Sequence, residues 1–356
     1  MSVNTSDTAT HHMADLCRAQ AALCAQLGSD LYVELLGRCA EDVEAGGPVW
    51  TVLRDLAGCP EESYPALRLL GSVHRLVLTG RAPALAAHYP SVGGRPGPGV
   101  WAAFRGVVVD HADRLTRLVQ SPPQTNEVGR AASLLGGFLQ VARETGRPLR
   151  LLEVGASAGL NLVWDRYRYE SGDWSWGDPA SALRITDVFV DATPASAPAT
   201  VVERLGCDLS PIDVRTEEGR LTLLSYVWPD QIERHERLRS AIRIAGGTDP
   251  LVRVERAAAI DWLGRQLASP RAGAATVVFH SIVLSYFDGA ERRAFGDLLV
   301  DAGRRATADA LLAWLSLEPS GGRFEVRLRT WPGGGERLLA VVGGHGLPVR
   351  CLAGNA

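Results

Sequence analysis

The chain has 356 residues, 46% hydrophobic and 22% charged, and a formal net charge of -3. These values are typical of a globular protein with one large or two average domains, and they give no sign of the basic surface that nucleic-acid binding requires, so we expect no nucleic-acid partner. All 37 basic residues are arginine. The lack of lysine excludes Schiff-base chemistry and the lysine of phosphate loops, and therefore pyridoxal phosphate and nucleoside triphosphates as cofactors.

The six cysteines never form a C-x-x-C pair, so we expect buried free thiols and no metal site. The N-terminal segment has neither a basic nor an apolar signal region, and no run of about 18 apolar residues occurs. We therefore expect a cytoplasmic protein without membrane association, either a monomer or a homodimer.

The first third of the chain is predicted to be helical. Between Ala14 and Val119, apolar residues recur at three- and four-residue spacing, with breaks at glycine and proline, which is the period of an amphipathic helix. The segment SPPQ, residues 121–124, is a plausible hinge. We expect residues 1–124 to form a helical N-terminal cap domain.

The next segment predicts a helix followed by a buried strand. Thr125 or Asn126 is a natural N-cap, Glu127 falls in the first turn, and Gly146 is a natural C-cap. The apolar run PLRLLEVG that follows, residues 148–155, has the length and composition of a buried parallel strand. A glycine-rich loop and a further helical stretch come next.

The remainder alternates between strand-like and helix-like segments. TVVERLGCDLSP, LVRVERA, ATVVFHSIVL and DALLAWLSLEP are strand-length apolar runs separated by helical stretches, and the C-terminal tail alternates in a period of two around a glycine turn. Such alternation predicts a doubly wound, mostly parallel α/β sheet closed by a hairpin. We assign this domain to residues 125–356.

The loop LLEVGASAGLNL, residues 151–162, has two incompatible interpretations. As G-x-S-x-G it matches the nucleophile elbow of a serine hydrolase, with Ser157 as nucleophile. As E-x-G-x-S-x-G it is a degenerate nucleotide loop. The hydrolase interpretation is disfavoured because the only GGG run follows the serine by about 180 residues, and because Glu153 would place a carboxylate beside a developing oxyanion.

The nucleotide interpretation requires an acid at the end of the second strand, where it accepts hydrogen bonds from ribose hydroxyls. Asp208 in GCDLSP occupies that place. It lies 55 residues after Glu153, since 208 - 153 = 55, whereas a dinucleotide fingerprint expects about 20. The excess predicts an aromatic-rich insertion at about residues 164–200.

Several motifs resemble a known family. Glu153-x-Gly155, Gly159 and GCDLSP resemble the first two motifs of class I S-adenosylmethionine-dependent methyltransferases, and VVFHSIVLSYF resembles their fourth strand. The whole chain also resembles an uncharacterised domain-of-unknown-function family, through LLEVGASAGLNL, LSYVWPDQ, VVFHSIVLSYF and LRTWPGG. The resemblance implies a Rossmann-like, seven-stranded sheet and S-adenosylmethionine as cofactor.

It also implies the site residues. The cofactor-binding set is Glu153, Gly155, Ala156, Ser157, Gly159, Asn161, Asp208, Leu209 and Asp261. Ser157 replaces the middle glycine of the superfamily, and Asp261 is the nearest substitute for an acid missing after the third strand. The catalytic set is His280, Ser281 and Tyr286, with His280 as the candidate base, because its free pKa lies near working pH.

The substrate-binding candidates are Asn126, Glu127, Trp164, Tyr169 and Glu318. The first two are equally well explained as a helix cap, and the aromatic pair as packing of the insertion. We expect a methyltransferase acting on a small-molecule acceptor. The alternatives are an enzyme that transfers or cyclises the aminocarboxypropyl arm of the cofactor, a serine hydrolase, and a non-catalytic ligand-binding relic.

Overall fold

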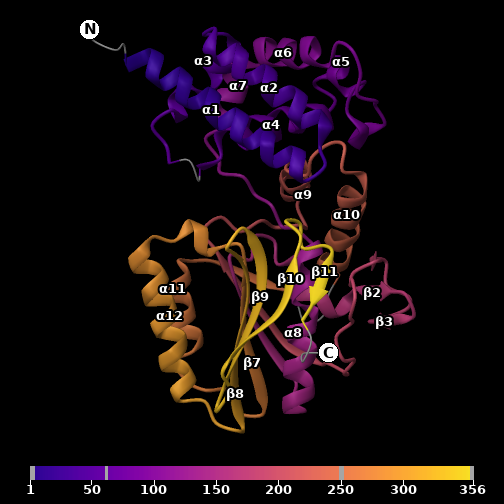
Figure 1. The fold of residues 1–356 in the computed structure, drawn as a ribbon, viewed down its shortest axis with the longest axis vertical. Helices are drawn as coiled ribbons and strands as arrows, with labels where there is room; N and C mark the ends of the chain where they lie inside the picture. The colour runs from indigo at the N-terminus through magenta and orange to yellow at the C-terminus, as the bar shows by residue number, and fades with distance from the viewer. Residues whose placement is uncertain (1–4, 61–62, 248–251, 353–356) are drawn as a thin grey trace. The chain divides into compact units, whose positions relative to one another are not determined.

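The computed structural model describes residues 5–60, 63–247 and 252–352 (Figure 1). Contacts divide the chain into two compact units. One comprises Met1–Thr125 and Thr216–Glu236, and the other comprises Asn126–Arg215 and Arg237–Ala356. The sequence assigned everything from residue 125 onward to a single domain, whereas the segment 216–236 packs with the helical unit instead.

The first unit is all helical, as the three- and four-residue spacing predicts. Its elements are α1 (Thr5–Gln26), α2 (Asp30–Glu44), α3 (Pro48–Leu53), η1 (Arg54–Leu56), α4 (Pro65–Leu78), α5 (Pro83–Ala86), η3 (Pro90–Val92), α6 (Val100–Asp110), α7 (Ala112–Leu118) and α9 (Glu217–Ser225). The apolar faces of these helices form one continuous core, in which Leu35, Leu69 and Phe104 have no exposed surface.

The segment 216–236 completes this core. Trp228 is a core residue and its ring lies 5.9 Å from that of Tyr32. Polar contacts fix the segment further, since Ser29 Oγ donates to Asp230 Oδ1 at 2.8 Å. The boundary between the units then falls within α10 (Ile232–Gly246).

The second unit is built on an eight-stranded sheet. Its strands are β1 (Leu149–Val154), β5 (Val201–Asp208), β6 (Arg253–Arg256), β7 (Ala274–Ser281), β8 (Ala310–Ser320), β9 (Arg323–Trp331), β10 (Glu336–Val342) and β11 (Val349–Cys351). They lie in the order β11-β10-β9-β8-β7-β1-β5-β6. The five from β8 to β6 are parallel, and β9, β10 and β11 continue as an antiparallel meander.

The expected α/β class, mostly parallel sheet and closing hairpin are confirmed, and the expected number of seven strands is wrong. The additional strand is β11, which pairs with β10 after the hairpin. Because parallel strands end at the same edge, β1, β5, β6, β7 and β8 define a carboxyl edge and an amino edge. The strand order reverses direction between β1 and β7, and ligands bind at such a switch point on the carboxyl edge.

Helices cover both faces of the sheet (Figure 1). On one face lies α8 (Gly129–Thr145), where Phe138 packs edge-on against Phe279 of β7 with ring centroids 5.1 Å apart. On the other face lie α11 (Ala259–Gln266) and α12 (Gly289–Arg304), whose Trp262 and Phe295 share a core with Leu152 and Val278 of the strands. Asp288 caps α12 in a capping box with Glu291.

The predicted insertion contains a second, small sheet. A 3-10 helix, η4 (Leu160–Arg166), follows the glycine loop, and the strands β2 (Arg168–Ser171), β3 (Trp174–Trp176) and β4 (Arg184–Ile185) pair in the order β3-β2-β4. Arg204 of β5 ties η4 to the main sheet through two bonds of 2.7 Å to Asp165.

One expected helix start is wrong. The helix α8 begins at Gly129, and neither Thr125 nor Asn126 is its N-cap. The reason is that the side-chain oxygen of Asn126 accepts hydrogen bonds from two amides of the glycine loop. The C-cap is as predicted, with Gly146 at φ 61°.

Two further features concern the whole chain. The six cysteines are free thiols, as expected, and four of them are buried, whereas Cys59 and Cys351 are partly exposed. Within the described part of the chain, no helix has both the length and the apolarity needed to cross a bilayer.

Candidate functional site at the carboxyl edge

The glycine loop joins the end of β1 to η4 and is tightly wound. Gly155, Ser157 and Gly159 all have positive φ, at 68°, 50° and 73°. A Cβ on Gly155 would lie 2.5 Å from Cγ2 of Val283, in the turn that follows β7. Gly155 is therefore required both for its backbone conformation and for the close approach of two loops at the switch point.

Ser157 is the strained member of the loop, because a left-handed conformation costs a non-glycine residue about 1–2 kcal/mol. Two main-chain bonds hold it there: its N–H donates to Asp208 Oδ2 at 2.9 Å, and its carbonyl accepts from Ile212 N at 3.0 Å. Strain persists where surrounding contacts over-determine a conformation, and this often occurs at functional sites.

All six amides of the loop are already bonded within the protein. In chain order from Gly155 to Leu160, their acceptors are the Cys207 thiol, Cys207 O, Asp208 Oδ2, Asn126 Oδ1, Ala156 O and Asn126 Oδ1. Loops that bind phosphate present such N–H groups to the ligand. This loop instead uses them to fix its own shape.

Asp208 ends β5 beside the loop, as expected from GCDLSP. Its second oxygen, Oδ1, accepts from Ser210 N at 2.8 Å. Leu209, next in the chain, is 72% exposed. Asp261 is an exposed residue in the first turn of α11, and so lies outside this hydrogen-bond network.

Glu153 lies in β1 just before the loop and is buried. Burial raises its pKa well above the ordinary value, and the nearby Asp208 raises it further, while a hydrogen bond from Asn161 and the charge of Arg130 oppose the shift. Glu153 Oε2 and Asn161 Oδ1 are both buried without a hydrogen-bond partner. When the Glu153 carboxyl is ionised, both atoms are acceptors, and the group that would satisfy them is then a donor.

Asn126 and Glu127 precede α8. Asn126 Oδ1 bridges the amides of Ala158 and Leu160 at 3.2 and 3.0 Å, which makes Asn126 part of the loop architecture. Glu127 Oε1 accepts from Gly129 N at 3.0 Å. Both side chains are buried, so their positions fit a structural role in shaping the site.

The fourth-strand candidates lie at the ends of β7 and β8. His280 has no exposed surface, and both its ring nitrogens are engaged: Nδ1 lies 2.7 Å from Glu318 Oε1, and Nε2 accepts from Trp314 Nε1 at 2.9 Å. The carbonyl of Ser281 accepts from Arg130 at 3.1 Å, and Tyr286 is 59% exposed. In this arrangement His280 has no free lone pair for a substrate or for Ser157.

The aromatic candidates Trp164 and Tyr169 are fully buried. The Trp164 ring stacks between Phe138 and Trp176, with centroid distances of 4.6 and 5.1 Å, and the Tyr169 hydroxyl donates to the Trp164 carbonyl at 2.8 Å. The rings thus pack the insertion onto the sheet. Neither offers a surface to a substrate in this conformation.

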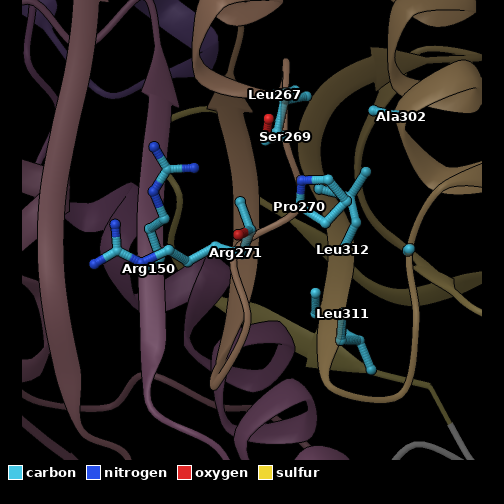
Figure 2. A pocket seen from close by; sticks show the side chains of 11 residues that line it. Arg150, Leu267, Ser269, Pro270, Arg271, Ala302, Leu311 and Leu312 are labelled. Atoms are coloured by element: carbon cyan, nitrogen blue, oxygen red, sulfur yellow. The ribbon is translucent and has the colours of Figure 1, made fainter.

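A small pocket in the same unit lies away from the glycine loop and the candidate site residues. A pocket of about 20 Å³, room for about one water molecule, lies at the amino edge, where it is lined by Arg150, Thr276 and Leu312 (Figure 2). Arg150 bonds Glu203 and, twice, Gln266. Because the guanidinium that lines this pocket is already fully bonded, we take the carboxyl edge as the candidate site.

Sequence reasoning did not find the bridging role of Asn126 or the bonds between His280, Glu318 and Trp314. Both depend on residues 32 to 38 positions apart that meet only when strands and loops assemble. It also missed Ile282, whose φ of 53° is a genuine outlier for a β-branched residue.

The comparisons with known proteins place the chain in a family without assigning a reaction. A family model described as "Uncharacterized protein conserved in bacteria (DUF2332)" matches residues 14–350. The chain therefore belongs to this family. No curated protein matches it.

Proposed function

We propose, from the geometry of the carboxyl edge, that the chain is an S-adenosylmethionine-dependent transferase. The simplest reaction of this type is methyl transfer to a small-molecule acceptor. Three features that occur together at the carboxyl edge support the proposal. The amides of the glycine loop are bonded within the protein, the Asp208 carboxylate lies beside them, and buried acceptor atoms lack hydrogen-bond donors.

This combination favours a cationic, phosphate-free ligand. A phosphate-bearing nucleotide needs N–H donors, and the loop amides are already used. S-adenosylmethionine has an ammonium group, ribose hydroxyls and a positive sulfonium, so it supplies donors and positive charge. The acceptors Glu153 Oε2 and Asn161 Oδ1 fit such a ligand.

Each residue then has a defined role. Asp208 would accept hydrogen bonds from ribose hydroxyls with lone pairs left free by Ser157 and Ser210. Exposed Leu209 would pack against the base. Glu153 would ionise when the ligand's positive charge binds beside it, and would then receive the ammonium together with Asn161. When bound, the cofactor supplies an electrophilic methyl group. The chain contributes mainly by holding both reactants in line, which is catalysis by proximity and orientation.

The proposal gives His280 a different role from the one that its residue type suggests. With Nδ1 and Nε2 both bonded, His280 orients Glu318 and does not itself exchange a proton with the acceptor. Ser281 and Tyr286 remain candidates for contact with the acceptor, because they border the same turn.

Calorimetry on the full chain tests the proposal. We expect S-adenosylmethionine and S-adenosylhomocysteine to bind, and adenosine triphosphate, which has phosphates and no ammonium, not to bind. Binding of neither sulfur compound at millimolar concentration would remove the basis of the proposal. With an acceptor in hand, S-adenosylhomocysteine as by-product indicates methyl transfer, and methylthioadenosine indicates transfer of the aminocarboxypropyl arm.

A further inference from the structure

A linear arrangement of three side chains crosses from β8 to β7 and back at the carboxyl edge. Trp314 Nε1 donates to His280 Nε2 at 2.9 Å, and His280 Nδ1 lies 2.7 Å from Glu318 Oε1. An indole nitrogen is only a donor, so Nε2 of the neutral ring carries no proton. The proton lies on Nδ1 and points at Glu318.

The two oxygens of Glu318 have different surroundings. Oε1 accepts from His280 and also from the amides of Val283 and Leu284, at 3.0 and 3.4 Å. Oε2 is buried and has no hydrogen-bond partner, and neither does the hydroxyl of Ser285 in the covering turn. Three donors thus fix the carboxylate in place through one oxygen, and the other oxygen is left to bind a further donor.

The turn whose amides bond Glu318 lies near the surface. Residues 282–285 are partly exposed, Tyr286 is 59% exposed, and the Glu318 side chain is 14% exposed. The turn begins at Ile282 in the left-handed region, which stores strain that a rearrangement would release. The same turn carries Val283, which closely approaches Gly155 of the glycine loop.

We propose that Glu318 binds a protonated amine of the acceptor through Oε2, with His280 and Trp314 as positioning residues that aim the carboxylate. The inference rests on the proposed function in treating the ligand as the acceptor of a transfer reaction. It goes beyond it by naming the chemical class. An ammonium group both donates hydrogen bonds and pairs with the carboxylate charge, and charge-assisted bonds are about twice as strong as neutral ones.

The test is a titration of the ¹⁵N-labelled full chain with benzylamine, and in parallel with the uncharged benzyl alcohol. The chain has nine tryptophans, and the signal absent from Trp314→Phe assigns the Trp314 indole N–H. We expect benzylamine to shift that signal saturably and benzyl alcohol not to shift it. Equal shifts with both compounds would overturn the inference, because charge would then not be recognised.

Variants locate the binding. Glu318→Gln preserves shape and removes the charge, and it should weaken benzylamine binding roughly ten- to hundredfold. Glu336→Gln, on the surface of the same unit, is the matched control and should leave binding unchanged. Trp314→Phe should weaken binding by a smaller factor, monitored by thermal shift. Unchanged affinity in a folded Glu318→Gln protein would overturn the inference.

The outcome is separable from that of the proposed function. Amine binding that depends on Glu318 but occurs in a chain with no affinity for S-adenosylhomocysteine would support this site and reject the transferase. Normal S-adenosylhomocysteine binding in Glu318→Gln, together with amine binding insensitive to the substitution, would reject this site alone.

Discussion

The two edges of the parallel sheet differ in how their polar groups are satisfied. At the amino edge, each nitrogen of the Arg150 guanidinium bonds Glu203 or Gln266 beside a small pocket. At the carboxyl edge, Glu153, Asn161 and Glu318 each have a buried oxygen without a partner, and Ser157 and Ile282 are strained. The difference shows that unsatisfied acceptors and backbone strain gather at the carboxyl edge, whereas the small pocket lies at the edge where the arginine is fully bonded.

We expect the largest effect, a loss of stability, from a substitution at the amino edge. Arg150→Met removes a mostly buried guanidinium and leaves Glu203 and Gln266 without partners, so we expect unfolding to become easier by about 2–3 kcal/mol. Urea denaturation measures this. Affinity for S-adenosylhomocysteine should stay within twofold, and a tenfold change would show that the two edges are not independent.

At the carboxyl edge, Asp208→Ala removes the acceptor of the Ser157 and Ser210 amides and of the proposed ribose hydroxyls. We expect S-adenosylhomocysteine affinity to fall roughly ten- to hundredfold by calorimetry. Asp261→Ala, at an exposed acid, is the control and should bind normally. If Asp208→Ala also bound every ligand normally, the chain would be better described as a binding relic.

Glu153→Gln should make stability less dependent on pH. Because the folded-state pKa of Glu153 is raised, the folded protein retains a proton that the unfolded chain releases above the usual glutamate pKa of about 4.3. Between the unfolded-state pKa and the raised folded-state pKa of Glu153, the free energy of unfolding of the wild type falls as pH rises, by at most about 1.4 kcal/mol per pH unit.

Glu153→Gln has no carboxyl at this position and so does not lose stability in this way. Its free energy of unfolding relative to that of wild type should therefore increase from pH 5 to pH 7.5, as measured by urea denaturation. Parallel pH profiles for the two proteins would mean that Glu153 is ionised in the folded state.

The smallest expected effect is at Ser157. Ser157→Gly relieves a left-handed serine but adds glycine flexibility to the unfolded chain, so we expect a gain of at most about 1 kcal/mol. S-adenosylhomocysteine affinity should be retained. Stoichiometric labelling of wild-type Ser157 by a fluorophosphonate, lost in the variant, would instead favour the hydrolase interpretation.

The strands and the loop could be predicted from sequence because their signals are local. A buried run such as LRLLEV predicts β1, and GCDLSP predicts where Asp208 ends β5. The role of Asn126 could not be predicted, because an asparagine before a helix fits a cap equally well. The tautomer of His280 could not be predicted either, since it depends on Trp314, 34 residues away on the neighbouring strand.

The segment 216–236 has a consequence for how the protein can be divided. Because Trp228 and Asp230 supply core packing and polar anchors to helices from the first 125 residues, cutting the chain near residue 125 would leave the N-terminal piece with a hole where Trp228 belongs. The helical unit is therefore not a portable module. It can be exchanged or expressed alone only if residues 216–236 are supplied with it. The two units therefore cannot be separated by a single cut in the chain.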